Sequence, residues 1–409
     1  MVASGKGSNR VVLRDRYFRR LVASRLISNI GNGMAPIALA FGVLALPGAT
    51  PTSLSIVLAA TAIPAVLLLP IGGVVADRVG KPRMISSTDM VLSGVVMITA
   101  VLLITGNATV VNLAILGAIT GALNAMWWPA YPGLVPDVVE EQHLQPANAL
   151  MGVASNGGLI VGSAIGGILV TFVGSGWAIA VDSLTFLAAG LLVFSIRHLS
   201  RPNESSGSML ADLAHGWRVF VSYKWVVAIV ASFSFIVMVW RGAEEVLGPV
   251  TAREYYGGPA GWAVVVSAQA FGLLAGALIA TRLRPRRPLV LGMIAMLALP
   301  LFLVLLAFAA PLWAVAASSF LLGACIEVFG ILWFTALQTH VPSEAISRVS
   351  AYDALGSMMF GPIGLALAGP LLAIMSLEQA FLLGAAVALA AVVGGLVPRA
   401  VRSLVAESP

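Results

Sequence analysis

Residues 73–83 read GVVADRVGKPR, a short charged turn at the point where two long apolar runs meet. The runs cover residues 53–76 and 84–104, and a helix needs about 20 mostly apolar residues to cross a bilayer. One acidic and three basic side chains could follow these runs into lipid only at a large cost in free energy. The stretch therefore predicts two membrane helices joined by a turn that faces water.

The same alternation of apolar runs and short polar turns continues along the whole chain. It predicts twelve transmembrane helices in two sets of six, over residues 21–46, 53–76, 84–104, 110–131, 148–172, 177–196, 225–250, 261–281, 289–308, 313–338, 350–374 and 379–397. The predicted domains are an N-terminal six-helix bundle (1–196), a cytoplasmic linker (197–224) and a C-terminal six-helix bundle (225–409). This all-α fold class, with two pseudo-symmetric bundles, is the layout of a transporter with a central site.

The composition supports a membrane protein. Of the 409 residues, 59% are hydrophobic and only 10% are charged, whereas roughly a quarter of the residues of a soluble globular domain are charged. A soluble enzyme and a disordered chain are therefore both excluded. Twenty of the 23 Lys and Arg residues fall in segments that share one side if the helices alternate in direction. This bias predicts that both termini are cytoplasmic, and it explains the net charge of +6 without a nucleic acid as partner.

The linker contains a predicted amphipathic helix from Ser208 to Lys224. Its apolar side chains share one helix face and are Leu210, Leu213, Trp217, Phe220 and Val221. We expect this helix to lie on the inner membrane surface. A role in binding DNA or another protein is the alternative.

Acidic side chains inside the predicted helices are candidates for coupling transport to protons, because an unneutralised charge near the bilayer centre is costly. Glu327 is the acid nearest the bilayer middle and the first candidate. Glu244 and Glu245 follow Arg241, which can pair with one of them and leave the other acid to titrate. Asp182 is the fourth candidate. The alternatives are structural hydrogen bonds and, for the Glu pair, an outer gate or a self-neutralised cluster.

Polar and aromatic side chains in the helices are candidates for lining a substrate cavity. Arg25, Asn29 and Asn32 are spaced by four and three residues, so they share one helix face. The whole candidate set is Arg25, Asn29, Asn32, Asn124, Trp128, Arg241, Gln269 and Trp333. Arg25 can instead extend its charge toward the inner surface, and the tryptophans can act as interface anchors. Asp89 and Asp353 lie near inner helix ends and are expected to be gate or capping residues, with a role as proton carriers as the alternative.

The sequence predicts neither catalytic nor metal chemistry. The histidines, His143, His198, His215 and His340, are too scattered for a metal site, and the one cysteine is Cys325. No phosphate-binding loop of the G-x-x-x-x-G-K-[ST] type is present, so ATP is not expected to drive the protein directly. We therefore expect a protein that is not an enzyme and has no cofactor.

The turn at residues 73–83 closely resembles the cytoplasmic signature of the major facilitator superfamily, G-x-L-A-D-R-x-G-R-K. Residues 276–287 resemble a degenerate copy, with Thr281 in the place of the acid. The resemblance implies a cytoplasmic gate built from Gly73, Asp77, Arg78, Gly80, Lys81 and Arg83. In this gate Asp77 would accept hydrogen bonds from the N-terminus of the eleventh helix and latch the outward-facing state. A basic turn that only sets topology is the alternative.

The fifth predicted helix carries Gly158, Gly162, Gly166 and Gly167 and is similar to the G-x-x-x-G-P-x-x-G-G motif of antiporters in this superfamily, with Ser163 in place of proline. Glycines four residues apart allow close helix packing. Residues 129–150 and 341–349 resemble loops of the bacterial enterobactin-exporter and macrolide-efflux group. This resemblance implies a proton-driven exporter of drugs or siderophores in the bacterial cytoplasmic membrane.

The expected function is proton-coupled efflux of an amphiphilic small molecule by alternating access. The expected partners are that molecule, protons and membrane lipid, and the monomer is the expected active form. An importer, a facilitator or a lipid flippase of the same fold is the alternative among transporters. A polytopic membrane enzyme or signalling protein is the alternative of another class, although the sequence shows no cluster of catalytic polar residues.

Overall fold

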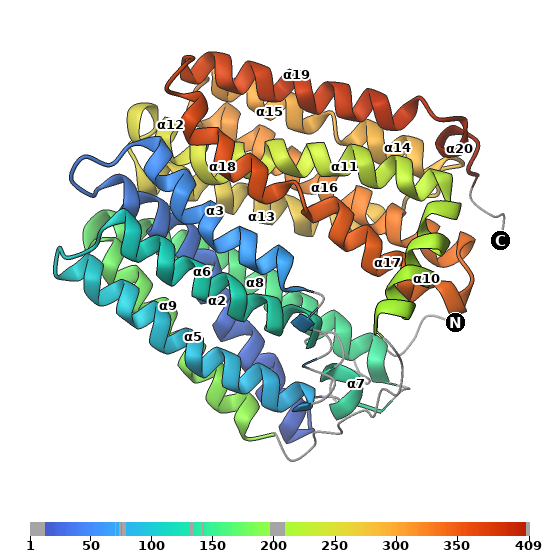
Figure 1. Cartoon of the computed structure of the whole chain (residues 1–409), viewed down its shortest axis with the longest axis horizontal. Helices are drawn as coiled ribbons and strands as arrows, with labels where there is room; N and C mark the ends of the chain where they lie inside the picture. The colour runs from blue at the N-terminus through green and yellow to red at the C-terminus, as the bar shows by residue number, and fades with distance from the viewer. Residues whose placement is uncertain are drawn as a thin grey trace. The chain divides into compact units, whose positions relative to one another are not determined.

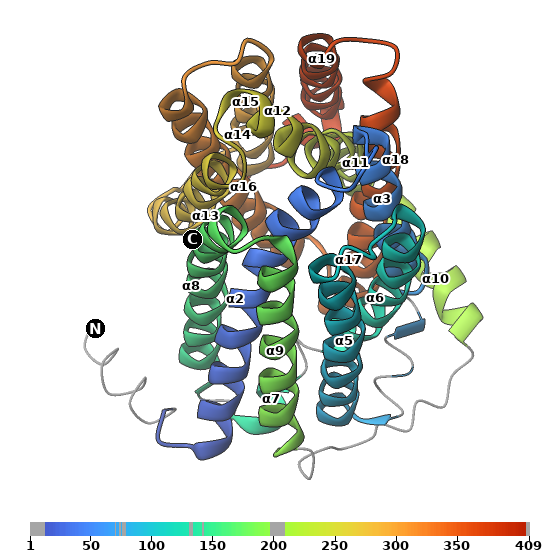
Figure 2. The same cartoon turned by 90° about the vertical axis from the view of Figure 1, so that its left-hand side faces the viewer.

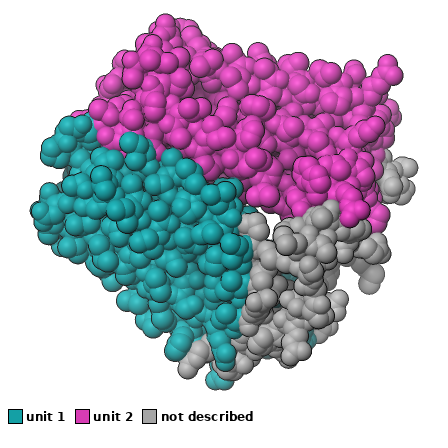
Figure 3. All heavy atoms as spheres, viewed as in Figure 1, with its two compact units in different colours: residues 1–49, 56–205 teal, residues 50–55, 206–409 magenta. Residues whose placement is uncertain are grey.

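The structure is a computed structural model that describes residues 13–69, 71–72, 75, 79–130, 134–140, 143–196 and 209–405. All regular structure in these residues is helical. The chain divides into two compact units, which have different colours in Figure 3. Unit 1 contains residues 1–49 and 56–205, and unit 2 contains residues 50–55 and 206–409. The start of the second predicted helix thus belongs to unit 2, whereas the rest of that helix belongs to unit 1.

Unit 1 is built around its first long helix. Figure 2 shows this helix, α2 (Arg16–Leu44), side by side with α8 (Leu144–Phe172) and α9 (Ser175–Phe194). Next to α9 lies α5 (Lys81–Ile104), which packs in turn against α6 (Val110–Ala130). The remaining helices of this part of the chain are α3 (Pro51–Leu67) and the short α7 (Leu134–Val138).

Residues without side chains bring α2 and α8 into close contact. A Cβ atom added at Gly162 of α8 would overlap the backbone carbonyl of Ile30 on α2. Gly158 and Gly166 approach α2 in the same way, one turn to either side. Because a glycine presents only its backbone, this spacing lets the two helices pack along their whole contact.

Unit 2 contains the helices of the second half of the chain. They are α10 (Met209–Ser222), α11 (Lys224–Gly242), the π-helix η3 (Ala243–Leu247), α12 (Gly248–Tyr255), α13 (Pro259–Ala280), α14 (Pro288–Ala295), α15 (Ala298–Ala307), α16 (Leu312–His340), α17 (Ser343–Met358), α18 (Gly361–Leu371), α19 (Leu377–Leu396) and α20 (Arg399–Arg402). In Figure 1, α15 runs beside α19 at the edge of this unit. The contact between α13 and α16 contains Gly272, Gly276 and Gly323, which let the two backbones meet.

Two predicted helices of the second half are interrupted, and a proline follows each interruption. The helix predicted at 289–308 is divided into α14 and α15 by a turn at Met296, four residues before Pro300. The helix predicted at 350–374 begins earlier, and its first part, α17, ends at Met358, four residues before Pro362. A proline ring clashes with the carbonyl of the residue four positions earlier and offers it no N–H. Both predicted spans are therefore present, and each contains a turn that was not predicted from the sequence.

Eleven helices in the described part of the chain are long and apolar enough to cross a membrane. α3 is a shorter apolar helix, and the helix predicted there, 53–76, includes residues 70, 73–74 and 76, which lie outside the described part. Large apolar side chains are exposed along the helices, as at Phe172 (81%), Ile374 (79%) and Trp313 (75%). Such a surface suits contact with lipid. The prediction of an all-helical membrane protein is confirmed for the described residues.

The amphipathic helix predicted in the linker is present as α10. Its Trp217 and Phe220 side chains both contact the ring of Tyr352 on α17. The apolar side of α10 therefore packs in part against α17, while Trp217 stays half-exposed at 53%.

Candidate functional site

The polar site of unit 2 is centred on the carboxyl group of Glu244. Gln269 of α13 donates a hydrogen bond from Nε2 to Glu244 Oε2 at 3.1 Å. The indole N–H of Trp240, one turn earlier on α11, donates to the same oxygen. One carboxylate oxygen therefore accepts hydrogen bonds from two different helices.

A π-helix positions this acid. The segment η3 replaces a regular α-helical turn and contains both Glu244 and Glu245. Pro249 follows Glu245 by four residues, and it has no backbone N–H with which to close the α-helical hydrogen bond to that residue. A π-turn redirects the backbone hydrogen bonds and lets the helix continue into α12. Such turns occur frequently at functional sites.

The neighbouring acid has a different partner. Arg241 forms an ion pair with Glu245, four residues later along the helix. In the described part of the chain, no cation lies within ion-pair distance of Glu244. Of the two adjacent acids, Glu244 is therefore held by hydrogen bonds and Glu245 by a charge. Adding a proton to Glu244 breaks no ion pair.

Glu327 lies on α16 near this site. Its side chain is half-buried and forms no hydrogen bond or ion pair with the described residues. One turn earlier on α16, Gly323 lies against the backbone of Gln269. Glu327 therefore lies about 6 Å along the α16 axis from Gly323, the point where α16 meets Gln269. The structure thus places three predicted residues, Glu244, Gln269 and Glu327, around one region of unit 2.

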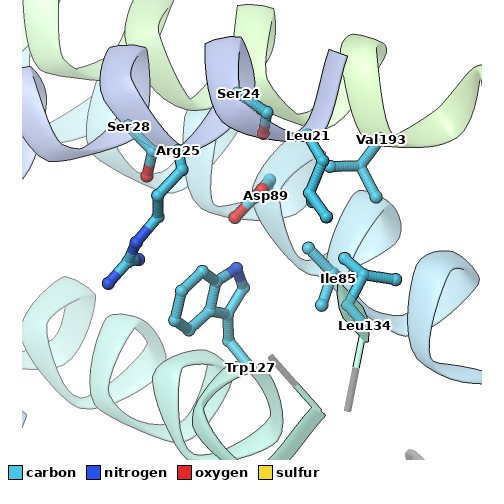
Figure 4. Close-up of a pocket in the computed structure, with 9 residues that line it drawn as sticks. All are labelled: Leu21, Ser24, Arg25, Ser28, Ile85, Asp89, Trp127, Leu134 and Val193. Atoms are coloured by element: carbon cyan, nitrogen blue, oxygen red, sulfur yellow. The ribbon is translucent and has the colours of Figure 1, made fainter. Parts of the chain in front are cut away.

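Unit 1 has a polar site of its own, a small cavity between α2, α5 and α6 (Figure 4). The guanidinium carbon of Arg25 lies 5.1 Å from the centre of the Trp127 ring, close enough for a cation–π interaction. Arg25 also donates a hydrogen bond from Nε to Ser155 Oγ on α8, at 2.8 Å. These contacts hold the guanidinium group between α2, α6 and α8.

Asp89 is a wall of the same cavity, and its position near a helix end had favoured a gate or capping role over that of a proton carrier. Its side chain is 2% exposed, and its Oδ1 atom has no hydrogen-bond partner among the described residues. On the opposite side, Gly190 of α9 lies against its Cβ atom. The spacing of four between Asp89 and buried Ser93 was the signal in the sequence for a polar face inside the bundle.

The other cavity candidates of unit 1 do not gather at one point. Asn29 is buried and donates a hydrogen bond to the carbonyl of Arg25 at 2.9 Å, within its own helix. Asn32 and Asn124 are half-buried. The side chain of Trp128 lies outside the described part of the structure.

Asp182, the acid candidate of unit 1, lies where α9 packs against α2. Its side chain is 2% exposed and faces Gly31, where an added Cβ atom would overlap Asp182 Oδ1. The hydroxyl of Thr185 lies 3.5 Å from the same oxygen. Among the described residues, no cation lies within ion-pair distance of this carboxyl group.

Trp333 is part of the packing of unit 2. Its side chain is 5% exposed, and its indole N–H donates a hydrogen bond to Asp353 Oδ2 at 2.8 Å. Its ring is nearly parallel to that of Phe329 and edge-on to that of Trp225. These contacts join α16 to α17 and α11.

The predicted gate motif is only partly covered by the structure. Gly73, Asp77 and Arg78 lie outside the described residues. Gly80 has a φ angle of 92°, in the region that favours glycine, and it precedes the first residue of α5, Lys81. Arg83 is exposed in the first turn of that helix. The latch between this turn and the eleventh helix stays a prediction.

The glycine motif of the fifth predicted helix lies along α2. Gly158, Gly162 and Gly166 form the close contact described above, and Gly167 is also buried. Ser163, which stands in place of the motif's proline, keeps its backbone N–H and donates its hydroxyl to the carbonyl of Ile160 at 3.0 Å. α8 accordingly continues without a break from Leu144 to Phe172.

Comparison with known protein families gives one family for most of the chain. The model of the Major Facilitator Superfamily matches residues 21–356. YkuC of Bacillus subtilis, an uncharacterized MFS-type transporter, is 26% identical over 354 residues, which are 83% of this chain and 81% of that protein. The multidrug efflux pump Tap of Mycolicibacterium fortuitum is 26% identical over 383 residues, with 88% and 90% coverage.

Solved structures share the fold at lower sequence identity. The nucleoside transporter NupG superposes with a TM-score of 0.73 and 14% identity, over 93% of this chain and 98% of that protein. A bacterial homologue of the iron transporter ferroportin, in an inward-facing state, superposes with a TM-score of 0.73 and 13% identity, with the same coverage. Their substrates differ, so this likeness concerns the fold and not the cargo.

Proposed function

The chain belongs to the major facilitator superfamily and is a multi-pass membrane transporter, and from this premise we propose that it exports an amphiphilic small molecule in exchange for protons. Similarity to the multidrug efflux pump Tap over most of the chain supports efflux as the direction. The bacterial origin of these relatives supports the cytoplasmic membrane as the location.

The proposed topology has twelve helices with both termini in the cytoplasm. α3 and the residues after it supply the span that is additional to the eleven long helices. The charge bias supports the orientation, because twenty of the 23 basic residues then lie on the cytoplasmic side or at its membrane boundary. The monomer is the proposed active form, with the substrate, protons and lipid as its partners.

One observation carries the proposed proton coupling: Glu244 accepts hydrogen bonds from Gln269 and Trp240, while Arg241 is paired with Glu245. A carboxyl group in an apolar protein interior is costly to ionise, so the environment decides whether it holds a proton. The hydrogen bonds from Gln269 and Trp240 are stronger when Glu244 is charged than when it is neutral. Protonation therefore favours one conformation of the transporter and substrate binding the other, as alternating access requires.

The test uses everted membrane vesicles whose lumen is acidified by respiration, with ethidium as an amphiphilic cationic probe. An exporter should move ethidium into the lumen and protons out, so the lumen should become more alkaline when the dye is added. We expect Glu244→Gln to abolish the alkalinisation. Glu378→Gln, which changes an exposed acid at the start of α19, is the matched control and should behave like the parent.

Two outcomes would contradict the proposal in different ways. Normal alkalinisation by the Glu244→Gln protein would remove Glu244 from the coupling mechanism. Ethidium movement without any proton movement in the parent protein would instead indicate a facilitator, and movement in the opposite direction would indicate an importer.

A further inference from the structure

Unit 1 contains two buried acids that the Glu244 site does not use. Asp89 of α5 and Asp182 of α9 are each 2% exposed. Neither forms an ion pair with a described residue, and Asp89 Oδ1 also has no hydrogen-bond partner there. An acid in the middle of a helix bundle is expensive to keep in a membrane protein, and where it persists it commonly marks a path for ions or protons.

Ser28 of α2 lies between the two acids. It is 4% exposed and lines the same cavity as Asp89. Its hydroxyl forms no hydrogen bond with the described residues. One turn further along α2 is Gly31, whose missing side chain leaves room for the carboxyl group of Asp182. Because residues three apart share a helix face, Ser28 and Gly31 lie on the same side of α2, about 4.5 Å apart along its axis, and the Asp182 carboxyl group faces Gly31 on that side.

We propose that Asp182, Ser28 and Asp89, together called the acid track, form a proton-transfer route through unit 1 that is separate from the Glu244 site of unit 2. The inference rests on the proposed proton coupling and extends it. Figure 4 shows the Asp89 end of the acid track, with Ser28 and Arg25 on the neighbouring helix. The cavity has room for about one water molecule, which would connect the Ser28 hydroxyl to Asp89.

Each step of the transfer conserves protons. Asp182 and Ser28 are not hydrogen-bonded to each other in the structure, so the first step takes place when side-chain rotation brings the two oxygens within hydrogen-bond distance. The O–H bond of neutral Asp182 then breaks as its proton passes to the Ser28 hydroxyl oxygen, and a carboxylate remains. The hydroxyl releases its own proton to the cavity water, which passes one of its protons to the Asp89 carboxylate. Ser28 and the water end unchanged, and Asp89 ends neutral. The reverse sequence returns the proton.

The charged surroundings differ at the two ends of the acid track. Arg25 of α2 is the charged group that faces Asp89 within the described structure, while α6 presents the indole of Trp127 and α9 presents Gly190. Asp182 is faced by Gly31 of α2 and by Thr185 of its own helix, with no charged group among its described neighbours. The two ends of the acid track therefore differ in the charged group that faces them, which is Arg25 at Asp89.

A second pair of buried hydroxyls supplies the matched control. Ser183 of α9 donates to the carbonyl of Ser93 on α5 at 2.8 Å, and their hydroxyl oxygens are 3.3 Å apart. Ser93 and Ser183 each lie within four residues of one of the two acids and are also buried, but their hydroxyls are bound to each other and to the backbone. It is therefore expected to hold α5 and α9 together without carrying protons.

The experiment compares Asp89→Asn, Asp182→Asn, Ser28→Ala and Ser183→Ala in the full chain, reconstituted into proteoliposomes. Proton movement is followed with a trapped pH-sensitive dye during ethidium transport. Counterflow of ethidium without a pH gradient reports substrate exchange, which needs no net proton transfer. We expect the first three variants to lose proton movement at least about tenfold while keeping counterflow, and Ser183→Ala to keep both.

The outcomes separate the acid track from the proposed function. If Glu244→Gln loses proton movement while the Asp89, Asp182 and Ser28 variants retain it, the acid track is wrong and the proposed function stands. If Ser183→Ala loses as much proton movement as Ser28→Ala, the assigned path is also wrong. If the parent moves ethidium without protons, both proposals fail. Ser28→Ala removes one oxygen atom only, so the test holds even if an Asn variant does not fold.

Discussion

Gln269 of α13 and Glu244 of the π-helix η3 are joined by a hydrogen bond of 3.1 Å, across 25 positions of the sequence. This bond ties the acid to a second helix, and the Trp240 indole ties it to its own helix. A change in the protonation of Glu244 therefore changes the strength of a hydrogen bond to α13, which packs along α16.

Replacing Gln269 by Leu should impair proton-driven export, because it removes one of the two donors to Glu244 and keeps the bulk of the side chain. A hydrogen bond to a charged group contributes about 1.5–3 kcal/mol, which corresponds to about tenfold or more in rate. The measurement is the initial rate of ethidium export in everted vesicles. Gln338→Leu, at an exposed position near the end of α16, is the control. An unchanged rate in Gln269→Leu would mean that this bond has no part in the cycle.

Replacing Gly162 by Ala should lower the melting temperature of the purified protein. The new Cβ atom would overlap the backbone carbonyl of Ile30, which cannot move without separating α2 from α8. Overpacking of this kind costs about 1–3 kcal/mol. Gly157→Ala on the same helix is the control, since a Cβ there meets no atom within 4 Å. The contact model for α2 and α8 is contradicted if both variants melt like the parent.

Replacing Gly31 by Ala should also destabilise the protein, and a second substitution at Asp182 can test the cause. The added methyl group would overlap the Asp182 carboxyl group and the Thr185 hydroxyl. Residues in contact give non-additive effects on stability. Gly31→Ala should therefore cost less in an Asp182→Ala background than in the parent, as measured by thermal unfolding in detergent. Additive losses would show that the two residues do not touch.

Replacing Trp333 by Phe should destabilise unit 2, because it leaves the buried Asp353 Oδ2 atom without its donor at 2.8 Å. An unsatisfied buried polar atom costs about 1–3 kcal/mol. Trp313→Phe changes a tryptophan that is 75% exposed, so it should unfold at the same temperature as the parent. Equal melting temperatures for the two variants would argue against a structural role of the Trp333–Asp353 bond.

Much of the fold could be predicted because its main signals are local. The length and apolar character of each run indicate a membrane helix without any information about which other helices it contacts. The prolines at 300 and 362 were also visible in the sequence, but a proline alone does not locate a break, because α2 and α3 continue across Pro36 and Pro64. Pro249 was a similar signal for the irregular turn that became η3.

The candidate site was less accessible, since its geometry depends on which helix faces meet. The sequence singled out Glu244 and Gln269 as separate candidates for different roles, and packing of unit 2 joined them. The sequence placed Asp89 near a helix end, whereas the fold of unit 1 buries this acid in a cavity that Arg25 and Ser28 also line. Neither neighbourhood follows from spacing along one helix.

By itself, then, the sequence determined the class of this protein: helices of membrane length, a charge bias that indicates orientation, and motifs that resemble one transporter superfamily. Each of these properties can be read from short stretches of sequence without knowing which helices are in contact. Only the tertiary structure decided that Glu245 takes the arginine while Glu244 takes two hydrogen-bond donors, and that Gly31 makes room for Asp182. The physical reason is that buried polar groups are satisfied by whichever neighbours packing brings within about 3 Å, and packing brings together residues far apart in the chain.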